Sequence, residues 1–502
     1  MSDTGKVWLV GAGPGDAGLF TRKGYDVLQA ADVVVYDSLV GDGVLAMVPE
    51  GARCIDVGKR AANHTMPQEQ IDQVLLDEAL AGNRVVRLKG GDPFLFGRGG
   101  EELELLTKNN VPYEVVPGIT SAIAVPAYNG IPVTHRDFTS SLHIITGHKR
   151  AGASYDIDFD ALVRTKGTLV VLMGVRSLPD IVAGLTGAGM DAATPAAVLQ
   201  EGTTAGQRRA VATLSTLEQA VQDAGIQAPA IIVVGDVCEL AEQFAWYEKL
   251  PLAGCKVVVT RPKELVSTMS ERLRTAGAEV LEIPSIATVP FDTNPALDEA
   301  IAALDTYSWI VLTSPSGADI FFDALGAAKA DVRRLASCKV AALGSGTAKA
   351  LAAHGIQADF VPSHATGETL GAELAKTAAP GSRILIPRAA IGGQELVEAL
   401  ADFTVDDVAT YDTVALEGGL VDLSGQFESG RIFCAAFTSS SGVTAFAKAH
   451  PGLDMSLVQA ACIGEKTRET ANTLGMRTWM AAEPSIDSLL DLIVEQFTAS
   501  KE

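Results

Sequence analysis

Short apolar runs alternate with Ala/Leu-rich stretches along the whole chain, and this alternation limits the folds that the chain can adopt. Runs such as KVWLVGAG, NRVVRLKGGD and PAIIVVGDV end in Gly or Asp and are typical of short buried strands. The segments between them, such as QEQIDQVLLDEALAG, carry apolar residues at helical spacing. Buried strands that alternate with helices predict an α/β fold with largely parallel sheets.

The pattern restarts near residue 250, where a Pro and a Gly precede a new strand in KLPLAGCKVVVTRP. Residues 255–500 also contain an internal repeat. In it VVVTRP, TSPSG and GSGTA recur as ILIPRA, TSSSG and GEKTR, at offsets of 120–127 residues. A period this long indicates paired domains rather than a solenoid. We therefore predict one domain over residues 1–250 and a second over 251–502, built from a duplicated αβ unit.

Charge and composition exclude several classes of partner. The net charge of −22 argues against nucleic acid. No apolar run approaches the ~18 residues that a membrane helix needs, so no membrane partner is predicted. The N-terminus lacks the basic start and apolar stretch of a signal peptide, which predicts a cytoplasmic protein. His135, His143 and His148 fit no standard ligand spacing, so no metal site is predicted.

The glycine-rich turn after the first strand allows more than one interpretation. Gly13, Gly15 and Gly18 satisfy GxGxxG, and Asp37 lies about where a ribose-binding acid would be, as in a dinucleotide-binding fold. Asp16 opposes this interpretation, because it stands at the helix start, where a pyrophosphate needs positive potential. Taken alone, the motif also fits an ordinary strand–turn–helix corner.

Two further motifs are much denser in glycine and small residues than a turn requires. They are RLKGGDPFLFGRGGEE (87–102) and VVPGITSAIAVPAYNGIPVTHRDF (115–138), and they allow the backbone to approach a flat ligand closely. Together with VVVYDSLV, VGKR, TLVVLMG and LQEGTTAGQR, they cover residues 5–247. This set resembles the tetrapyrrole methylase family, and within it the uroporphyrinogen-III C-methyltransferases.

The resemblance implies a two-lobed α/β domain that binds S-adenosylmethionine between its lobes and forms a homodimer. Carried over by motif, the implied cofactor-binding residues are Pro14, Gly90, Gly91, Asp92, Leu95, Thr120, Ser121, Met173 and Gly202. The resemblance also implies Asp37 as proton acceptor and Lys59 as proton donor. Ser38 departs from the Arg that follows the aspartate in some members, which leaves substrate contacts at this position open.

These residue types suit methylation of a pyrrole carbon. A sulfonium is an activated electrophile that needs no metal, and a carboxylate near the ring N–H can take a proton. Arg98 can form bidentate pairs with the carboxylates of uroporphyrinogen, and Glu101 is predicted to point into the same space. The alternatives are a helix N-cap for Asp37, a solvated side chain for Lys59, and a salt bridge from Arg98 to Glu101 or Glu102.

The motifs of the second half indicate a particular reaction less clearly, because they contain no nucleophile elbow, paired carboxylates or phosphate loop. Its Ser/Thr/Gly-rich turns after strands offer backbone amides to carboxylates, which would also suit a sensing module. Their order nevertheless resembles the uroporphyrinogen-III synthase family over residues 254–498. The resemblance implies two α/β lobes, 254–288 plus 416–498 and 289–415. It also implies cyclisation of hydroxymethylbilane, with loss of water and inversion of ring D.

Four residues of the second half are implied to serve that reaction. Tyr411 matches the tyrosine that assists departure of the hydroxyl, and Thr347, Ser439 and Thr467 lie on turns expected to contact substrate. The alternative for Tyr411 is a packed tyrosine between the lobes. The synthase product is the methyltransferase substrate, so we expect a bifunctional enzyme that forms precorrin-2 through precorrin-1. An active methyltransferase with a non-catalytic C-terminal module is the other possibility, and sirohaem and cobalamin both remain open as end products.

Overall fold

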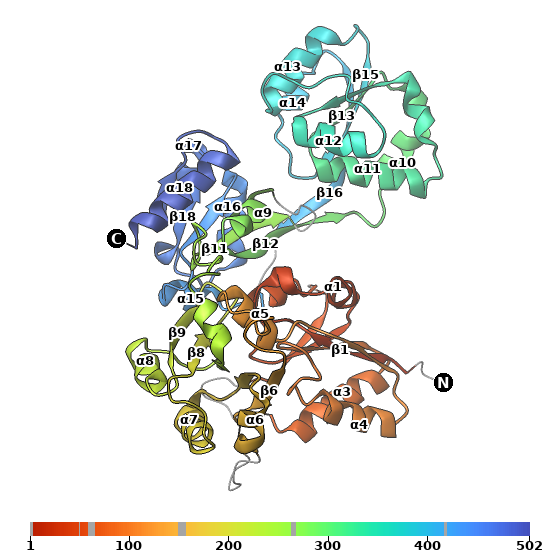
Figure 1. Cartoon of the computed structure of the whole chain (residues 1–502). Helices are drawn as coiled ribbons and strands as arrows, with labels where there is room; N and C mark the ends of the chain where they lie inside the picture. The colour runs from red at the N-terminus through yellow and green to blue at the C-terminus, as the bar shows by residue number, and fades with distance from the viewer. Residues whose placement is uncertain are drawn as a thin grey trace.

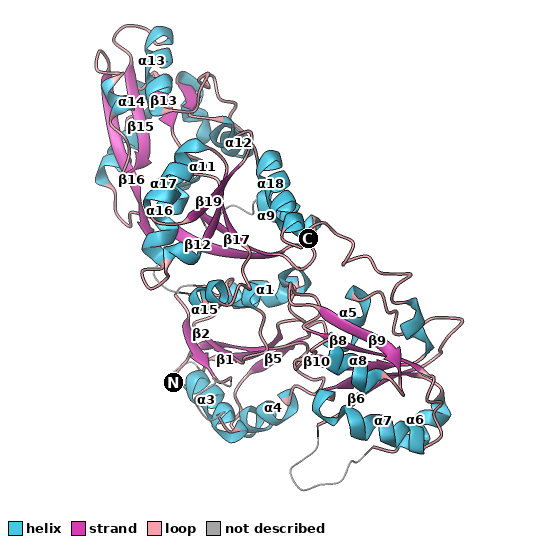
Figure 2. Cartoon of the chain, turned by 90° about the vertical axis from the view of Figure 1, so that its left-hand side faces the viewer, coloured by secondary structure: helices cyan, strands magenta, loops and turns pink. Residues whose placement is uncertain are grey.

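The computed structural model describes residues 4–49, 51–58, 66–148, 157–262, 268–415 and 419–501. Over these residues the strands form two five-stranded sheets in the N-terminal half and a nine-stranded sheet in the C-terminal half (Figure 1). Helices pack on the faces of each sheet, as seen from the side in Figure 2. The predicted α/β class is confirmed.

The first sheet is parallel throughout, in the order β3-β2-β4-β1-β5. Its strands are β1 (Lys6–Gly11), β2 (Val33–Tyr36), β3 (Arg53–Asp56), β4 (Arg84–Lys89) and β5 (Tyr113–Val116). The helices among them are η1 (Ala17–Leu19), α1 (Arg22–Gln29), α2 (Asp42–Leu45), α3 (Gln68–Leu80) and α4 (Gly99–Lys108). Valine-rich strands such as β2 are buried along their whole length, because helices cover both faces of a parallel sheet.

The second sheet has the order β6-β7-β10-β8-β9. Its strands are β6 (Leu142–Thr146), β7 (Thr168–Leu172), β8 (Pro195–Gln200), β9 (Arg208–Thr213) and β10 (Ala230–Val234). The helices of this lobe are α5 (Ser121–Tyr128), α6 (Phe159–Thr165), η2 (Val175–Ser177), α7 (Leu178–Gly187), α8 (Leu217–Asp223) and η3 (Asp236–Leu240).

The expectation of largely parallel sheets is wrong for this second sheet. Only β6 and β7 pair in parallel, whereas β10 is antiparallel to both β7 and β8, and β8 is antiparallel to β9. For the pair of β8 and β9 the reason is the length of the connection. Residues 201–207 join β8 to β9 and are too few for the crossover that parallel neighbours need.

The nine-stranded sheet has the order β14-β13-β15-β16-β12-β11-β17-β18-β19. Its strands are β11 (Lys256–Pro262), β12 (Glu279–Pro290), β13 (Trp309–Leu312), β14 (Lys339–Ala342), β15 (Arg383–Ala389), β16 (Thr404–Ala415), β17 (Cys434–Phe437), β18 (Gln459–Cys462) and β19 (Arg477–Met480). The α-helices are α9 (Thr268–Thr275), α10 (Pro295–Ala302), α11 (Pro315–Ala327), α12 (Ser345–Ala353), α13 (Gly367–Thr377), α14 (Glu395–Glu398), α15 (Leu423–Glu428), α16 (Ser440–Ala449), α17 (Glu465–Thr473) and α18 (Ile486–Ala499). Short 3-10 turns are η4 (Leu304–Thr306), η5 (Val332–Ser337) and η6 (Met455–Leu457).

This sheet repeats its own order about its centre. The two long strands β12 and β16 pair antiparallel in the middle, and every other pair in the sheet is parallel. Outward from the centre, β16-β15-β13-β14 on one side matches β12-β11-β17-β18 on the other. Register shifts follow Arg261 in β11 and Arg388 in β15, at equivalent places in the sequence repeat. Figure 1 shows the two groups of strands joined through β12 and β16.

The group around β11 lies against the N-terminal half. Lys256 Nζ lies 2.6 Å from Asp42 Oδ2 of α2, and Gln426 Nε2 of α15 donates to the same oxygen at 3.0 Å. Leu420 and Val421 pack against the apolar core of the first sheet. The domain boundary at residue 250 and the lobe limits given above remain predictions.

Candidate active site

Three turns at one edge of the first sheet meet through their backbones. The turns after β1 and β4 pair directly, with Gly13 N donating to Gly91 O at 3.1 Å and Gly91 N donating to Gly13 O at 2.8 Å. The turn after β5 is equally close, since a Cβ on Gly118 would lie 2.2 Å from Gly91 O. Such an approach requires glycine. The carboxyl edge of a parallel sheet is also where ligands bind in open α/β folds.

The space beside Gly91 is open, in contrast to the crowding around its neighbours. Gly91 has φ +68°, and a Cβ built there would come no closer than 3.9 Å to Ser121 N and Thr120 Cα. Thr120 caps α5 by accepting from Ala122 N at 3.2 Å. The turns therefore form a cradle bounded by backbone, which fits a ligand that a side chain would displace. Pro14 is half-buried next to this cradle, in the turn that contains Gly13.

The turn after β8, in the second lobe, contacts the turn after β1 and has a strained backbone. Thr203 is 3% exposed and has φ +72°, and Met173 after β7 has φ +55°. Positive φ is a genuine outlier for a β-branched residue and is retained only where the surroundings fix it. Thr203 Oγ1 accepts from Asp16 N at 3.1 Å, which ties the two lobes together. Gly202 packs so tightly that a Cβ would lie 2.4 Å from Val125 Cγ1 of α5.

Asp92 shapes the loop after β4. Its Oδ1 accepts from Phe94 N at 2.9 Å and Leu95 N at 3.1 Å, and its Oδ2 accepts from Gly118 N at 3.1 Å. Leu95 in turn packs against the apolar cluster that contains Val125. Both carboxylate oxygens of Asp92 are thus engaged by backbone, so this side chain fixes the loops around the cradle.

Asp37 follows β2 and holds a tight turn. Its Oδ1 accepts from Leu39 N at 3.0 Å, and its Oδ2 accepts from Arg87 Nη2 at 3.2 Å. The alternative of a helix N-cap is wrong, because α2 begins only at Asp42 and is capped by a glycine. The Asp37 side chain remains 24% exposed, so its carboxylate can still meet a ligand.

The turn of Asp37 also lies against the cradle. A Cβ on Gly90 would lie 2.6 Å from Leu39 Cβ, and one on Gly58 would lie 2.5 Å from Ser38 N. The segments YDSLV and KGGDP and the residue Gly58 therefore meet. Lys59, the predicted proton donor, lies outside the described residues.

Tyr411 lies on β16, at the pairing of the two long strands. It is 5% exposed, and its Oη lies 2.8 Å from Ser314 Oγ. Ser314 is the N-cap of α11 and also accepts from Gly317 N at 2.9 Å. The ring is packed, as expected from the alternative role of a packed tyrosine. Its hydroxyl is held in a defined position by Ser314, which the sequence did not indicate as a functional residue.

The other three residues of the C-terminal half lie at helix starts. Ser439 caps α16 by accepting from Gly442 N at 3.1 Å. Thr347 and Thr467 are in the first turns of α12 and α17, and each is 4% exposed. Glycines stand at the N-caps of α12 and α17 and give no side-chain cap, so their first amides are available to an anionic group.

Comparison with known proteins shows the family of each half. Residues 6–218 match the family model of Tetrapyrrole (Corrin/Porphyrin) Methylases, and residues 267–491 match that of Uroporphyrinogen-III synthase HemD. The porphyrin biosynthesis protein HemD of Ruminiclostridium josui is 46% identical over 98% of this chain and 98% of its own. The chain belongs to both families. The resemblances inferred from the motifs are thereby confirmed.

Two further similar proteins have names that describe the methylase activity. The uroporphyrinogen-III C-methyltransferase of Bacillus subtilis is 41% identical over 66% of this chain and 68% of its own. A crystal structure of uroporphyrin-III C-methyl transferase from Thermus thermophilus complexed with S-adenyl homocysteine is 40% identical. It covers 47% of this chain and 99% of its own, with a TM-score of 0.41.

The methylase half contains a buried charge cluster that the motifs did not reveal. Arg87, Lys89 and Glu102 are 3%, 4% and 0% exposed. Glu102 Oε1 accepts from Arg87 Nε at 3.1 Å and from Lys89 Nζ at 2.7 Å. Burial, reinforced by neighbouring Arg87, lowers the pKa of Lys89. The sequence did contain a signal for this cluster. Arg87 and Lys89 lie two positions apart on a buried strand, and buried charges need partners of opposite sign.

Arg98 and Glu101 pair with each other in the structure. Arg98 Nη2 lies 2.6 Å from Glu101 Oε2, and both side chains are about half exposed. The bond to Glu101 raises the pKa of the Arg98 guanidinium. The salt bridge weighed as the alternative is therefore present, and a substrate carboxylate would have to replace Glu101. Contact of either residue with substrate stays a prediction.

Among the described residues, no group of three or more His, Cys, Asp or Glu side chains is placed to hold a metal ion. Within the same ranges, no helix is both long and apolar enough to cross a membrane.

Proposed function

We propose that the methylase half transfers methyl groups from S-adenosylmethionine to carbons of uroporphyrinogen III, giving precorrin-2 through precorrin-1. The observation that carries the proposal is the open cradle beside Gly91, on which the turns of both lobes converge. S-adenosylmethionine would supply an activated methyl group there, held by the turns that contain the nine cofactor-binding residues named above. Backbone rather than charged side chains bounds this space, which suits a ligand without a pyrophosphate.

The chain's own residues would prepare the pyrrole. Asp37 would accept the proton of the ring N–H, because its carboxylate is partly exposed beside the cradle. Arg87, bonded to the same carboxylate and to buried Glu102, would hold it in place. Lys59 would act as the proton donor that the family resemblance implies. Arg98 would exchange Glu101 for a substrate carboxylate, as a bidentate donor can.

We further propose that the synthase half cyclises hydroxymethylbilane. Departure of the bilane hydroxyl as water breaks a C–O bond and needs a proton or a hydrogen bond, which Tyr411 would give. Ser314 would fix the tyrosine hydroxyl at 2.8 Å. Thr347, Ser439 and Thr467 would contact substrate carboxylates at the starts of their helices. A homodimer through the methylase half is part of the proposal and is tested by light scattering.

One incubation tests both activities. Hydroxymethylbilane is added to the full chain with and without S-adenosylmethionine, and products are separated by isomer and mass. We expect uroporphyrinogen III alone without the methyl donor, and precorrin-2 with it. Methylation only of supplied uroporphyrinogen III would mean a non-catalytic C-terminal module. Binding of NAD in place of S-adenosylhomocysteine would restore the dinucleotide interpretation.

Replacing Tyr411 with Phe tests the synthase assignment. The variant Tyr411→Phe should slow formation of uroporphyrinogen III, so that more bilane closes without enzyme to the type I isomer. The loss should be smaller than the ~10²–10³-fold that removal of one hydrogen-bond donor typically costs, because backbone amides can stabilise the developing charge as well. Phe keeps the ring packing, so unchanged thermal unfolding isolates the hydroxyl. A III-to-I ratio equal to that of the unmodified chain would remove Tyr411 from the mechanism.

A further inference from the structure

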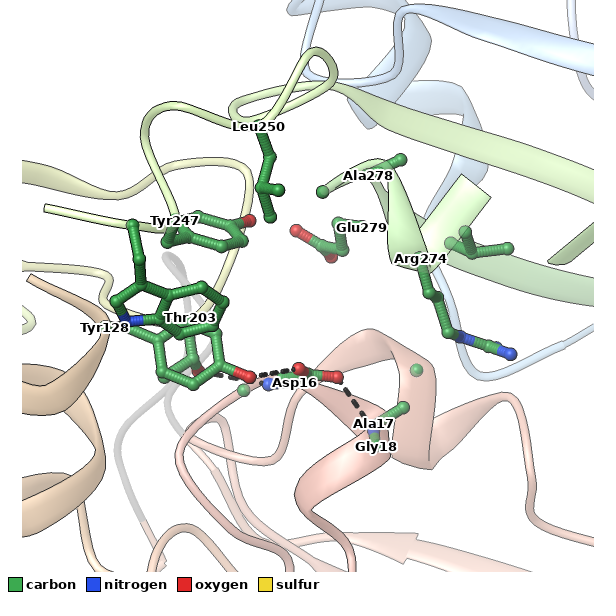
Figure 3. A pocket seen from close by; sticks show the side chains of 15 residues that line it. Asp16, Ala17, Gly18, Tyr128, Thr203, Tyr247, Leu250, Arg274, Ala278 and Glu279 are labelled. Atoms are coloured by element: carbon green, nitrogen blue, oxygen red, sulfur yellow. Dashed lines mark hydrogen bonds between the residues drawn. The ribbon is translucent and has the colours of Figure 1, made fainter. Parts of the chain in front are cut away.

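A cavity of about 200 Å³ lies between the two halves of the chain, and the cofactor turn forms one of its walls (Figure 3). From the methylase half it is lined by Asp16, Tyr128 and Thr203, and from the synthase half by Arg274 and Glu279. Tyr128 donates to Asp16 Oδ2 at 2.7 Å. The turn predicted to bind the methyl donor therefore faces residues of the other enzyme.

Glu279 connects the two halves directly. It is the first residue of β12, and its Oε2 accepts from Ala205 N of the methylase half at 2.8 Å. Its register partner on β11 is Lys256, whose Nζ lies 2.9 Å from Glu279 Oε1 and 2.6 Å from Asp42 Oδ2. Burial alone would lower the pKa of Lys256, but Glu279 and Asp42 together raise it, so the lysine stays charged. The cation in turn fixes the position of the Glu279 carboxylate.

Ala205 belongs to the strained turn between β8 and β9. Within this turn Glu201 has φ +42° and Thr203 has φ +72°. The methylase half contributes two restraints on Thr203, through the bonds to Asp16 N and to Gln207 Oε1 at 3.1 and 2.9 Å. The synthase half contributes the Glu279 carboxylate, which accepts from Ala205 N, and a longer bond from exposed Arg431 to Glu201 Oε1 at 3.3 Å. Strained conformations persist only where several neighbours determine them, so each restraint affects the population of the bound form of the turn.

We propose that Glu279, a residue of the synthase half, is a positioning residue for cofactor binding by the methylase half. This inference rests on the proposed methyltransferase function. Glu279 would act through Ala205 to hold Thr203 and Gly202 in the arrangement that the cofactor needs. Because such coupling is reciprocal, cofactor binding would also tighten the contact between the halves.

The test compares two replacements of Glu279 in the full chain. Glu279→Met removes the acceptor for Ala205 N at similar volume and should weaken binding of S-adenosylhomocysteine about tenfold by calorimetry. Glu279→Gln keeps an acceptor oxygen and should bind within about threefold of the unmodified chain. In steady state, Glu279→Met should raise KM for S-adenosylmethionine and leave kcat unchanged at saturation.

Arg274 provides the matched control. It lines the same cavity, but its guanidinium pairs with Glu282 of its own half at 3.4 Å rather than with the turn, so Arg274→Met should bind normally. Equal affinity for Glu279→Met and the unmodified chain would overturn the inference, as would equal weakening by Glu279→Gln. Failure of the unmodified chain to bind S-adenosylhomocysteine would instead refute the proposed function.

A second measurement needs no variant and decides the matter if Glu279→Met does not fold. Saturating S-adenosylhomocysteine should slow amide hydrogen exchange in residues 201–207 and also in residues 276–280 of the synthase half. Protection confined to the methylase half would overturn the coupling.

Discussion

The variant Asp37→Ala should transfer methyl groups about 10²–10⁴-fold more slowly, the range typical of general acid–base catalysis, while S-adenosylhomocysteine binds with near-normal affinity. The geometry explains why the rate should fall while the affinity stays near normal. The carboxylate lies at the edge of the cradle and bonds to Leu39 N and Arg87, and the cofactor turns are held by other contacts. Single-turnover assays with uroporphyrinogen III measure the rate, and calorimetry measures the affinity.

Asp37→Asn separates the chemical role from the structural one. Asn keeps an acceptor for Leu39 N, so it preserves the turn while removing the base. Both variants should therefore lose comparable activity if the carboxylate takes a proton. Full turnover by Asp37→Asn at native stability, with a defect only in Asp37→Ala, would leave Asp37 as a turn-forming residue.

The close approach of the glycine turns after β1, β4 and β5 could be anticipated from the sequence because its signals are local. That these turns bind the cofactor remains a prediction. A positive φ, or an approach of another backbone segment below 3 Å, restricts a position to glycine. The glycines of KGGDP and GITSA therefore predict the local backbone geometry. The internal repeat of the second half corresponds to the way in which the nine-stranded sheet repeats its own order about its centre, but it did not predict the order of the strands. The antiparallel pairs of the second sheet were not predicted. For β9 the reason is that its direction depends on the length of the connection after β8.

Pairings between distant residues were beyond what the sequence could show. Glu102 meets Arg87 across a loop, Ser314 meets Tyr411 from another strand's end, and Glu279 meets Ala205 from the other enzyme. None of these contacts follows from spacing or periodicity. Asp92 illustrates the reverse case, because its motif implied a ligand contact, whereas its carboxylate bonds to three backbone amides.

Gly91→Val is expected to abolish binding of S-adenosylhomocysteine, with an affinity at least about a hundredfold lower, or about 2.7 kcal/mol. A Cβ at Gly91 meets nothing closer than 3.9 Å, so the Val side chain starts in open space and would extend into the cradle. The half should therefore still fold. Calorimetry on the purified full chain gives the affinity, and circular dichroism confirms the fold.

Backbone strain requires its own control, because Val resists the φ of +68° at Gly91 and pays about 1–3 kcal/mol there. Gly189 has φ +92° with nothing within 4 Å of a built Cβ, and it follows α7 near the start of β8, away from the cradle. Gly189→Val should lose comparable stability yet bind S-adenosylhomocysteine normally. Unchanged affinity in folded Gly91→Val would remove KGGDP from the site. Equal loss in both variants would show that binding falls with stability rather than by occupation of the cradle. Loss in Gly91→Val alone would place the ligand against the Gly91 backbone.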